Sequence, residues 1–173
     1  ANNLAQPDAS LSFPLMFSQQ YKKYSELNGI DMSFPMAITR QESRFNRNAL
    51  AFDGGVGLMQ IMPATASYIA KKIGSDNCYK NYECNIKFGS WYLGHLNNKF
   101  GNNLIYASAG YNAGPGRAHR WQQAFQNMDN RIQIELIPFK ITRDYVQKVL
   151  TNKVVYDARL NNSPKVDILK YLN

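Results

Sequence analysis

Apolar residues recur at helical spacing along most of this chain, and few stretches alternate apolar and polar positions as strands do. Residues 85–101 show the pattern best, because Ile86, Leu93 and Leu96 form one apolar stripe. Phe88 and Trp91 lie off this stripe. The segment is therefore apolar on nearly all sides, which predicts a central, buried helix.

Proline near the start and glycine at the end bound several of the helical segments. Pro63 and Gly74 bracket one of them, and Ser33 is a candidate N-cap of another. Two glycine-rich segments, 52–63 and 109–116, separate helices. The sequence predicts a mainly α fold with a minor β-hairpin around residues 50–60. The expected helices cover residues 13–29, 33–45, 62–74, 85–101, 104–112, 116–126 and 142–160.

Length and composition fit one globular domain of 173 residues, with 45% hydrophobic and 18% charged residues. We expect residues 1–12 to be a flexible N-terminal segment and residues 13–173 to be the folded domain. No apolar stretch is long enough to span a bilayer. The polar start lacks the features of a signal peptide, so such a segment has been removed or the chain is cut from a longer one.

The net charge of +8 favours polyanionic partners such as nucleic acid, anionic lipid or acidic glycan. The basic residues are scattered, with pairs only at 22–23 and 71–72 and no basic run. We therefore expect no dedicated nucleic-acid site.

Cys78 and Cys84 are the only cysteines. They favour a local disulfide, which requires an oxidising compartment, although two free thiols in a reducing one fit the sequence as well. Two cysteines with His95 and His119 do not have the spacing of a zinc site. No metal or other cofactor is expected.

The most informative polar residue is Glu42, in the segment AITRQESRFN. At 100° per residue it shares a helix face with Ile38 and Phe45, whereas Arg40 and Arg44 point away. An apolar surrounding raises the pKa of a carboxyl, as a general acid working near neutral pH requires. The alternative is a glutamate at the edge of the stripe that reaches water or pairs with an arginine.

Four segments in fixed order then suggest a family: AITRQESRFN, GLMQIMPATA, AGYNAGPG and IPFKITRDYV. Together they resemble the catalytic domain of the Slt-type soluble lytic transglycosylases (family 1). The resemblance spans residues 13 to 157 and implies a lysozyme-like fold of the goose type, here called the SLT domain.

Members of this family cleave the β-1,4 bond between N-acetylmuramic acid and N-acetylglucosamine in peptidoglycan without water. The muramyl C6 hydroxyl closes onto C1 and leaves a 1,6-anhydro sugar. By resemblance, Glu42 protonates the glycosidic oxygen and then deprotonates that hydroxyl. Glycosidases usually need two carboxylates; here neither Asp53 nor Glu135 lies in a motif that indicates a partner for Glu42. One acid suffices if the substrate's N-acetyl carbonyl and C6 hydroxyl supply the nucleophiles.

The same resemblance implies the remaining site residues. Gly57 shapes the loop near the acid, and the Tyr111 hydroxyl points at the carboxyl of Glu42. Gln60 offers an amide that can both donate and accept hydrogen bonds to the sugar. The expected substrate-binding residues are Gln60, Met62, Tyr111, Asn112, Gly57 and Glu135.

Two positions depart from the common family pattern. Ile141 stands where relatives have a glutamate that lines the cleft, and Ala51 stands where they have a serine that holds the acetamido group. These departures bear on substrate positioning and leave the acid in place.

Two other functions remain open from the sequence. One is a hydrolytic muramidase, in which water attacks, and the other is a non-catalytic module that binds peptidoglycan. The expected partner is the peptidoglycan glycan strand in the periplasm or cell envelope of a bacterium. A longer helical region before this domain, or cell-wall partner proteins, would also fit the family.

Overall fold

The computed structural model describes residues 9–162, and this part of the chain is mainly α-helical. The first eight residues of the predicted flexible segment 1–12 lie outside the described residues, whereas residues 9–12 form a short helix. The described helices are α1 (Ala9–Ser12), α2 (Ser18–Leu27), α3 (Ser33–Ser43), α4 (Pro63–Ile73), α5 (Tyr82–Lys99), α6 (Leu104–Ala113), α7 (Pro115–Phe125), α8 (Asn130–Glu135) and α9 (Lys140–Leu160).

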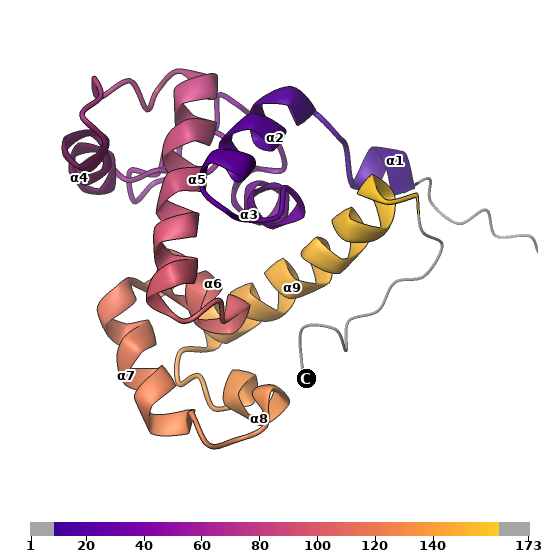
Figure 1. Ribbon diagram of the computed structural model, residues 1–173, viewed down its shortest axis with the longest axis vertical. Coiled ribbons are helices and arrows are strands. Elements are labelled where there is room, and N and C mark those ends of the chain that lie inside the picture. Colours follow the sequence, from indigo (N-terminus) through magenta and orange to yellow (C-terminus); the bar gives the residue numbers. More distant parts are fainter. Residues whose placement is uncertain (1–8, 163–173) are drawn as a thin grey trace, which may run out of the picture.

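Helix α5 runs through the middle of the molecule, with α4 on one side and α2 and α3 on the other (Figure 1). The side chain of Asn81 caps its first turn by accepting hydrogen bonds from the N–H groups of Glu83 and Cys84. Most of its residues are buried, including Phe88, which lies off the apolar stripe. The prediction of a central helix apolar on nearly all sides is confirmed.

Helices α3 and α9 pack against each other in antiparallel directions. Lys153 of α9 is buried, and its Nζ donates to Ser33 Oγ at 2.9 Å, at the start of α3. Further along, Asn152 Nδ2 donates to the carbonyl of Ala37 at 3.4 Å. Ser33 is thus the first residue of α3 and a partner of Lys153, whereas the N-cap position predicted for it belongs to Met32.

Local backbone conformation explains where the predicted helix starts and ends were wrong. The predicted helix 13–29 begins only at Ser18, because Phe17 before it has a left-handed φ of 56°. Helix α3 ends at Ser43, since Arg44 and Phe45 both have positive φ. Helix α8 was not predicted; it has six residues and begins after Asp129, whose side chain accepts from the N–H of Arg131.

The predicted hairpin is present only as two isolated antiparallel bridges, Leu50 with Val56 and Val56 with Ile61. The segment between α3 and α4 is otherwise a series of tight turns. Its glycines fit turns better than extended strands, and Gly54 and Gly57 both have positive φ.

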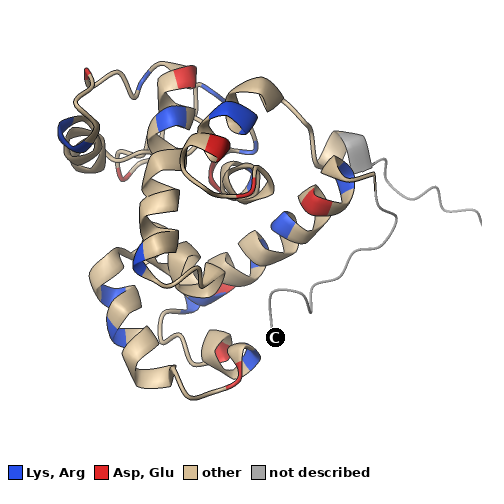
Figure 2. Ribbon diagram, in the orientation of Figure 1, with Lys and Arg blue, Asp and Glu red and all other residues tan. Residues whose placement is uncertain are grey.

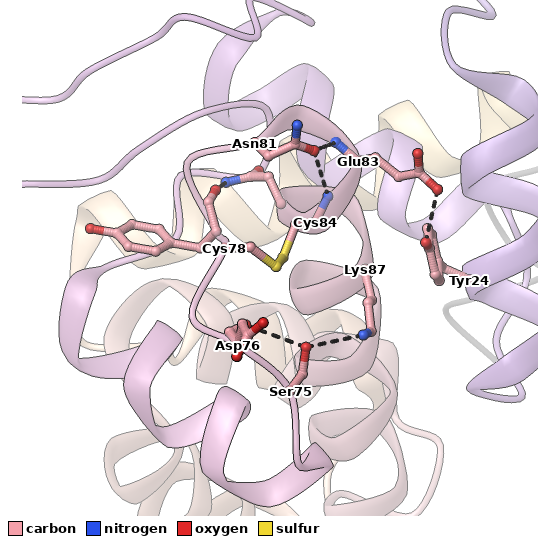
Figure 3. Close-up of a disulfide and its surroundings, with 10 residues drawn as sticks. Tyr24, Ser75, Asp76, Cys78, Asn81, Glu83, Cys84 and Lys87 are labelled. Atoms are coloured by element: carbon pink, nitrogen blue, oxygen red, sulfur yellow. Dashed lines mark hydrogen bonds between the residues drawn. A yellow bond between two sulfur atoms is a disulfide. The ribbon is translucent and has the colours of Figure 1, made fainter.

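Cys78 and Cys84 form a disulfide, so the prediction of a local bridge is confirmed (Figure 3). It closes the turn before α5. Beside it Glu83, in the first turn of α5, accepts a hydrogen bond from the hydroxyl of Tyr24 at 3.0 Å, which joins this end of α5 to α2. The carbonyl of Tyr79, inside the closed loop, accepts a hydrogen bond that is important for the site described below.

Lysine and arginine residues are spread over most of the helices, and no single element gathers them (Figure 2). No helix in residues 9–162 has the length and apolarity needed to cross a membrane.

Candidate active site

Glu42 lies in the last turn of α3, and its carboxyl is held from the opposite helix. The hydroxyl of Tyr145 in α9 donates to Glu42 Oε1 at 2.6 Å. The antiparallel packing of α3 on α9 fixes this pairing, because Lys153 binds the start of α3 while Tyr145 reaches its end. Tyr145 is itself buried, so the donor is held by packing.

The surroundings of Glu42 raise the pKa of its carboxyl to about 7, from an ordinary value of 4.5. Burial is the largest cause, because desolvation disfavours the charged form. The hydrogen bond from Tyr145 opposes this effect and lowers the pKa, whereas the negative charge of Asp53 raises it. The carboxyl is therefore divided between its acid and base forms near neutral pH. The side chain of Glu42 is half-buried, and its hydrogen-bond partner is Tyr145 rather than an arginine.

The tyrosine predicted to point at Glu42 was the wrong one. The hydroxyl of Tyr111 donates to the backbone carbonyl of Met59 at 2.8 Å, and Tyr145 makes the bond to the carboxyl instead. Tyr111 is still close enough for the charge of Glu42 to raise the pKa of its phenol, after the larger effect of burial. Tyr111 thus braces the loop next to the acid, while Tyr145 orients the acid.

Side-chain bonds attach the segment 49–61 to the end of α3 and to α5. Ser43, next to Glu42, donates from Oγ to the carbonyl of Leu58 at 2.7 Å. Asn85 of α5 is fully buried and accepts the N–H of Met59 at 2.8 Å. Its Nδ2 donates to the carbonyl of Val56 at 2.9 Å and to that of Tyr79 at 2.8 Å. Asn85 therefore links this segment to the disulfide-closed loop.

Gly57 shapes this segment, as expected, for two physical reasons. Its φ is +78°, a conformation that residues with a side chain rarely adopt. A Cβ at this position would also lie 2.7 Å from Asn85 Nδ2. Because Asn85 is buried and fully bonded, it has no room to move away.

Gly57→Ala is expected to destabilise the fold by about 3 kcal/mol, from backbone strain and crowding together. The matched control is Gly116→Ala, because a Cβ at Gly116 meets nothing within 4 Å. Thermal unfolding of the two variants measures the difference. Equal melting temperatures for both would show that the packing of Gly57 on Asn85 does not constrain the segment.

Gln60 has fewer free hydrogen-bonding groups for a sugar than the sequence suggested. Its Nε2 donates to the carbonyl of Gly57 at 2.7 Å and to that of Ala49 at 3.2 Å. Both amide hydrogens are thus engaged within the loop, and only Oε1 remains to accept a bond from a ligand. Gln60 also has a positive φ of 50°, a strained conformation of the kind that is often found at functional sites.

Met62 and Asn112 each lie near the end of a helix, Met62 before α4 and Asn112 at the end of α6. Met62 immediately precedes α4 and is 38% exposed, so it is available to a ligand rather than packed in the core. Asn112 is exposed near the end of α6, and its Oδ1 accepts from Thr142 Oγ1 at 2.8 Å. That bond holds the end of α6 against the start of α9.

Glu135 is exposed at the end of α8 and bonds to α9 rather than to the acid. Its Oε1 accepts from Gln147 Nε2 at 2.7 Å, and its carbonyl accepts from Arg143. The two departures from the family pattern, Ile141 and Ala51, are both exposed. The described structure thus connects Glu135 to Glu42 only indirectly, through α9.

Sequence reasoning missed Tyr145, Asn85 and Ser43 as members of the site. Tyr145 lies in the same motif as the departure at Ile141, and nothing in the local pattern distinguishes it from the apolar residues around it in the expected helix 142–160. Ser43 stands directly beside Glu42, and only its spatial contact with Leu58 gives it a role. No group of three or more potential ligands among the described residues could hold a metal ion.

Comparison with known proteins identifies the class that this fold and site define. The Transglycosylase SLT domain family matches residues 19–134, and the Soluble lytic transglycosylase helical domain matches residues 136–165. Because the first match covers most of the chain, the protein belongs to the Transglycosylase SLT domain family.

Relatives agree with this assignment. The chain is 39% identical over 161 residues to the soluble lytic murein transglycosylase of Escherichia coli K12, covering 88% of this chain and 24% of that protein. It is 41% identical over 156 residues to the enzyme of the same name from Salmonella typhimurium, covering 84% of this chain and 23% of that protein. The chain thus spans about a quarter of the length of these curated relatives.

Solved structures show the same fold. An inactive glutamate-to-glutamine mutant of lytic transglycosylase Slt from Pseudomonas aeruginosa superposes with a TM-score of 0.85 and 37% identity, over 95% of this chain and 28% of that one. The 70-kDa soluble lytic transglycosylase of Escherichia coli gives a TM-score of 0.85 and 36% identity, over 93% and 27%. The mainly α, lysozyme-like fold of the SLT domain is therefore confirmed.

Proposed function

We propose that this chain is the catalytic domain of a peptidoglycan lytic transglycosylase in which Glu42 acts first as acid and then as base. The observation that carries the proposal is the partly buried carboxyl of Glu42, with a pKa of about 7 and a hydrogen bond from Tyr145. Its relatives are soluble lytic murein transglycosylases, and replacing one glutamate by glutamine inactivates the Pseudomonas aeruginosa enzyme.

In the first step, protonated Glu42 donates its proton to the glycosidic oxygen between the two sugars. A pKa near the working pH keeps a large fraction of the carboxyl protonated and makes transfer efficient. The hydrogen bond from Tyr145 stabilises the carboxylate that this step leaves. Tyr145 therefore helps the acid to release its proton.

As the protonated glycosidic oxygen leaves C1, the substrate's N-acetyl carbonyl oxygen bonds to C1 in its place. In the second step, the same carboxylate accepts the proton of the muramyl C6 hydroxyl while that oxygen bonds to C1 and displaces the carbonyl oxygen. The acid is thereby restored, and no water is consumed. The substrate's N-acetyl carbonyl takes the role that a second carboxylate has in most glycosidases. Gln60 Oε1, Met62 and Asn112 are proposed to contact the sugars, and Tyr111 to support the loop that carries the first two.

A hydrolytic muramidase is the second candidate, and one observation favours it: the charge of Asp53 reaches Glu42 and raises its pKa. Asp53 is exposed in the loop after Ala51 and could serve as the second carboxylate. The two reactions give different products, since the anhydro product is one water lighter than the hydrolysed one.

We expect mass spectrometry of muropeptides released from purified sacculi to find 1,6-anhydromuramic acid at the ends of the products. Asp53→Asn is the informative variant, because it removes the candidate second carboxylate and should leave the product unchanged. Reducing-end muramic acid as the main product, lost on Asp53→Asn, would establish hydrolysis instead.

The proposed domain spans residues 13–173 and includes α9, although the family matches meet at residue 135. Helix α9 packs along α3, and its Tyr145 bonds to Glu42, which supports the proposal that the two matched segments act as one catalytic unit. The glycan strands of peptidoglycan are the proposed partner, and the periplasm or cell envelope is the proposed location. The Cys78–Cys84 disulfide supports an oxidising compartment.

A further inference from the structure

The disulfide and the candidate active site are joined through the buried side chain of Asn85. Asn85 directly follows Cys84, and Tyr79 directly follows Cys78, so these two residues flank the S–S bond. Asn85 Nδ2 donates to the carbonyl of Tyr79 at 2.8 Å. The hydrogen bond and the disulfide therefore join the same two parts of the chain, the loop before α5 and its first turn (Figure 3).

The amide of Asn85 has one orientation because all its hydrogen-bonding groups are used in different directions. The second hydrogen of Nδ2 goes to the carbonyl of Val56 at 2.9 Å, and Oδ1 accepts the N–H of Met59 at 2.8 Å. The amide is planar, so its donors and its acceptor turn together. If the carbonyl of Tyr79 moves away, the bonds to Val56 and Met59 lose their alignment as well.

The loop residues that this amide holds lie beside Glu42. The carbonyl of Met59 accepts a hydrogen bond from the hydroxyl of Tyr111 at 2.8 Å. Burial and then the charge of Glu42 raise the pKa of Tyr111, so this tyrosine lies close to the acid. The carbonyl of Leu58 accepts from Ser43 Oγ, next to Glu42, at 2.7 Å. A shift of this segment therefore changes the surroundings of the carboxyl.

We propose that Asn85 is a positioning residue for the reaction at Glu42 and that the disulfide maintains its orientation, so that reduction of the disulfide slows glycan cleavage by a folded protein. The inference rests on the proposed function, because it takes Glu42 to be the acid. The side chain of Tyr79 is buried, so the loop keeps its packing when the disulfide opens and loses only the close alignment of its carbonyl.

The disulfide is accessible to a chemical test, because Cys78 is exposed. A dithiol such as dithiothreitol exchanges with the S–S bond, leaves two thiols on the protein and is itself oxidised to a cyclic disulfide. Two electrons and two protons thus pass from the reagent to the protein. Since the chain has no cysteines besides Cys78 and Cys84, the reagent opens no other bond.

Amide hydrogen exchange tests the coupling without any catalytic readout. In dithiothreitol, the exchange rate of the Met59 N–H is expected to rise about tenfold relative to that of Val149, because the acceptor on Asn85 has lost its alignment. Val149 is buried in α9 and reports opening of the whole domain. The same factor for both amides would overturn the proposal.

Clearing of sacculi by the parent is expected to slow about fivefold to tenfold in dithiothreitol, the effect of weakening one or two hydrogen bonds, and to recover on reoxidation. The matched control is the double variant Cys78→Ala/Cys84→Ala, which should clear at the rate of the reduced parent with or without the reagent. A parent rate that is independent of dithiothreitol would overturn the proposal. Failure of the oxidised parent to clear sacculi would overturn the proposed function instead, and the exchange of Met59 would still decide the coupling.

The pH profile separates a positioning role from a general loss of stability. Glu42 faces Asp53 in the loop, Tyr111 of α6 and Tyr145 of α9. Loosening the loop admits water to the carboxyl and weakens the effect of burial, the largest cause of its raised pKa. The limb on which activity falls with rising pH should therefore move to lower pH on reduction. A lower rate with an unshifted limb would contradict the positioning role.

A pair of asparagine variants tests whether the disulfide acts through Asn85. Asn85→Ala is expected to slow cleavage at least as much as reduction does, and reduction should add little to it, since both changes act on the same amide. Asn97→Ala is the matched control, because Asn97 is another buried asparagine of α5 and its Nδ2 bonds to Asn102 instead. It should respond to dithiothreitol as the parent does. Additive losses in Asn85→Ala would overturn the proposal, and if that variant does not fold, the measurements on the parent decide.

Discussion

Replacing Glu42 by glutamine is expected to lower the rate of glycan cleavage by roughly a thousandfold or more. Glutamine keeps the size of the side chain and can still accept the bond from Tyr145, but it neither gives nor takes a proton. In the proposed mechanism one carboxyl serves both steps, so the substitution removes both together. The loss of turbidity of purified sacculi measures the rate.

Glu26→Gln is the control for this experiment, since Glu26 is an exposed carboxyl on α2 whose removal should leave clearing unchanged. Comparable clearing by Glu42→Gln and the parent would remove Glu42 from the mechanism. Failure of the parent itself to clear sacculi, with binding retained, would instead support a non-catalytic peptidoglycan-binding module.

The free energy of unfolding of the parent and of Glu42→Gln provides a second test of the Glu42 carboxyl. The folded state raises the pKa of Glu42 from 4.5 to about 7, so folding favours the protonated form. The protein therefore loses stability as the pH rises through this interval, by about 3 kcal/mol for a shift of this size. Glu42→Gln lacks this dependence, so its stability relative to the parent should increase between pH 5 and pH 8.

Tyr145→Phe is expected to lower kcat by about tenfold to a hundredfold, the usual worth of a hydrogen bond to a charged group. It should also shift the pH profile. The bond from Tyr145 lowers the pKa of Glu42, so its removal raises that pKa further. The limb on which activity falls with rising pH, as the acid form is lost, therefore moves to higher pH. Rates on sacculi across the pH range measure both effects.

Tyr111→Phe is the matched control, because Tyr111 is a neighbouring tyrosine whose hydroxyl bonds to the Met59 carbonyl. Its removal loosens the loop and should leave the pH profile of Glu42 in place. A shifted pH profile in Tyr111→Phe, with an unshifted one in Tyr145→Phe, would support the prediction from the sequence that Tyr111 contacts Glu42. It would contradict the hydrogen bond from Tyr145.

The sequence predicted those parts of the fold that depend on local pattern. The stripe around Leu93 located α5, and Pro63 and Gly74 marked both ends of α4, where Gly74 has the left-handed conformation of a helix end. The face shared by Glu42 with Ile38 was also readable, because it follows from helix geometry alone. The raised pKa of Glu42 agrees with that interpretation.

The parts that were missed depend on contacts between distant segments. Tyr145 is 103 residues from Glu42 along the chain, and only the packing of α9 on α3 brings them together. Gln60 donates its amide hydrogens to carbonyls of its own loop and has a positive φ, and neither feature can be predicted from a glutamine at that position. Asn85 was assigned to the central helix without a role, since its three partners come from two separate loops.

The antiparallel pairing of α3 with α9 also bears on how the protein is made. Glu42 is synthesised before the tyrosine that orients it and before the lysine that binds the start of its helix, since each of the two contacts joins residues more than a hundred positions apart. A nascent chain that has not yet released α9 from the ribosome therefore holds the acid without its support. The proposed catalytic activity is therefore expected only after α9 has been translated.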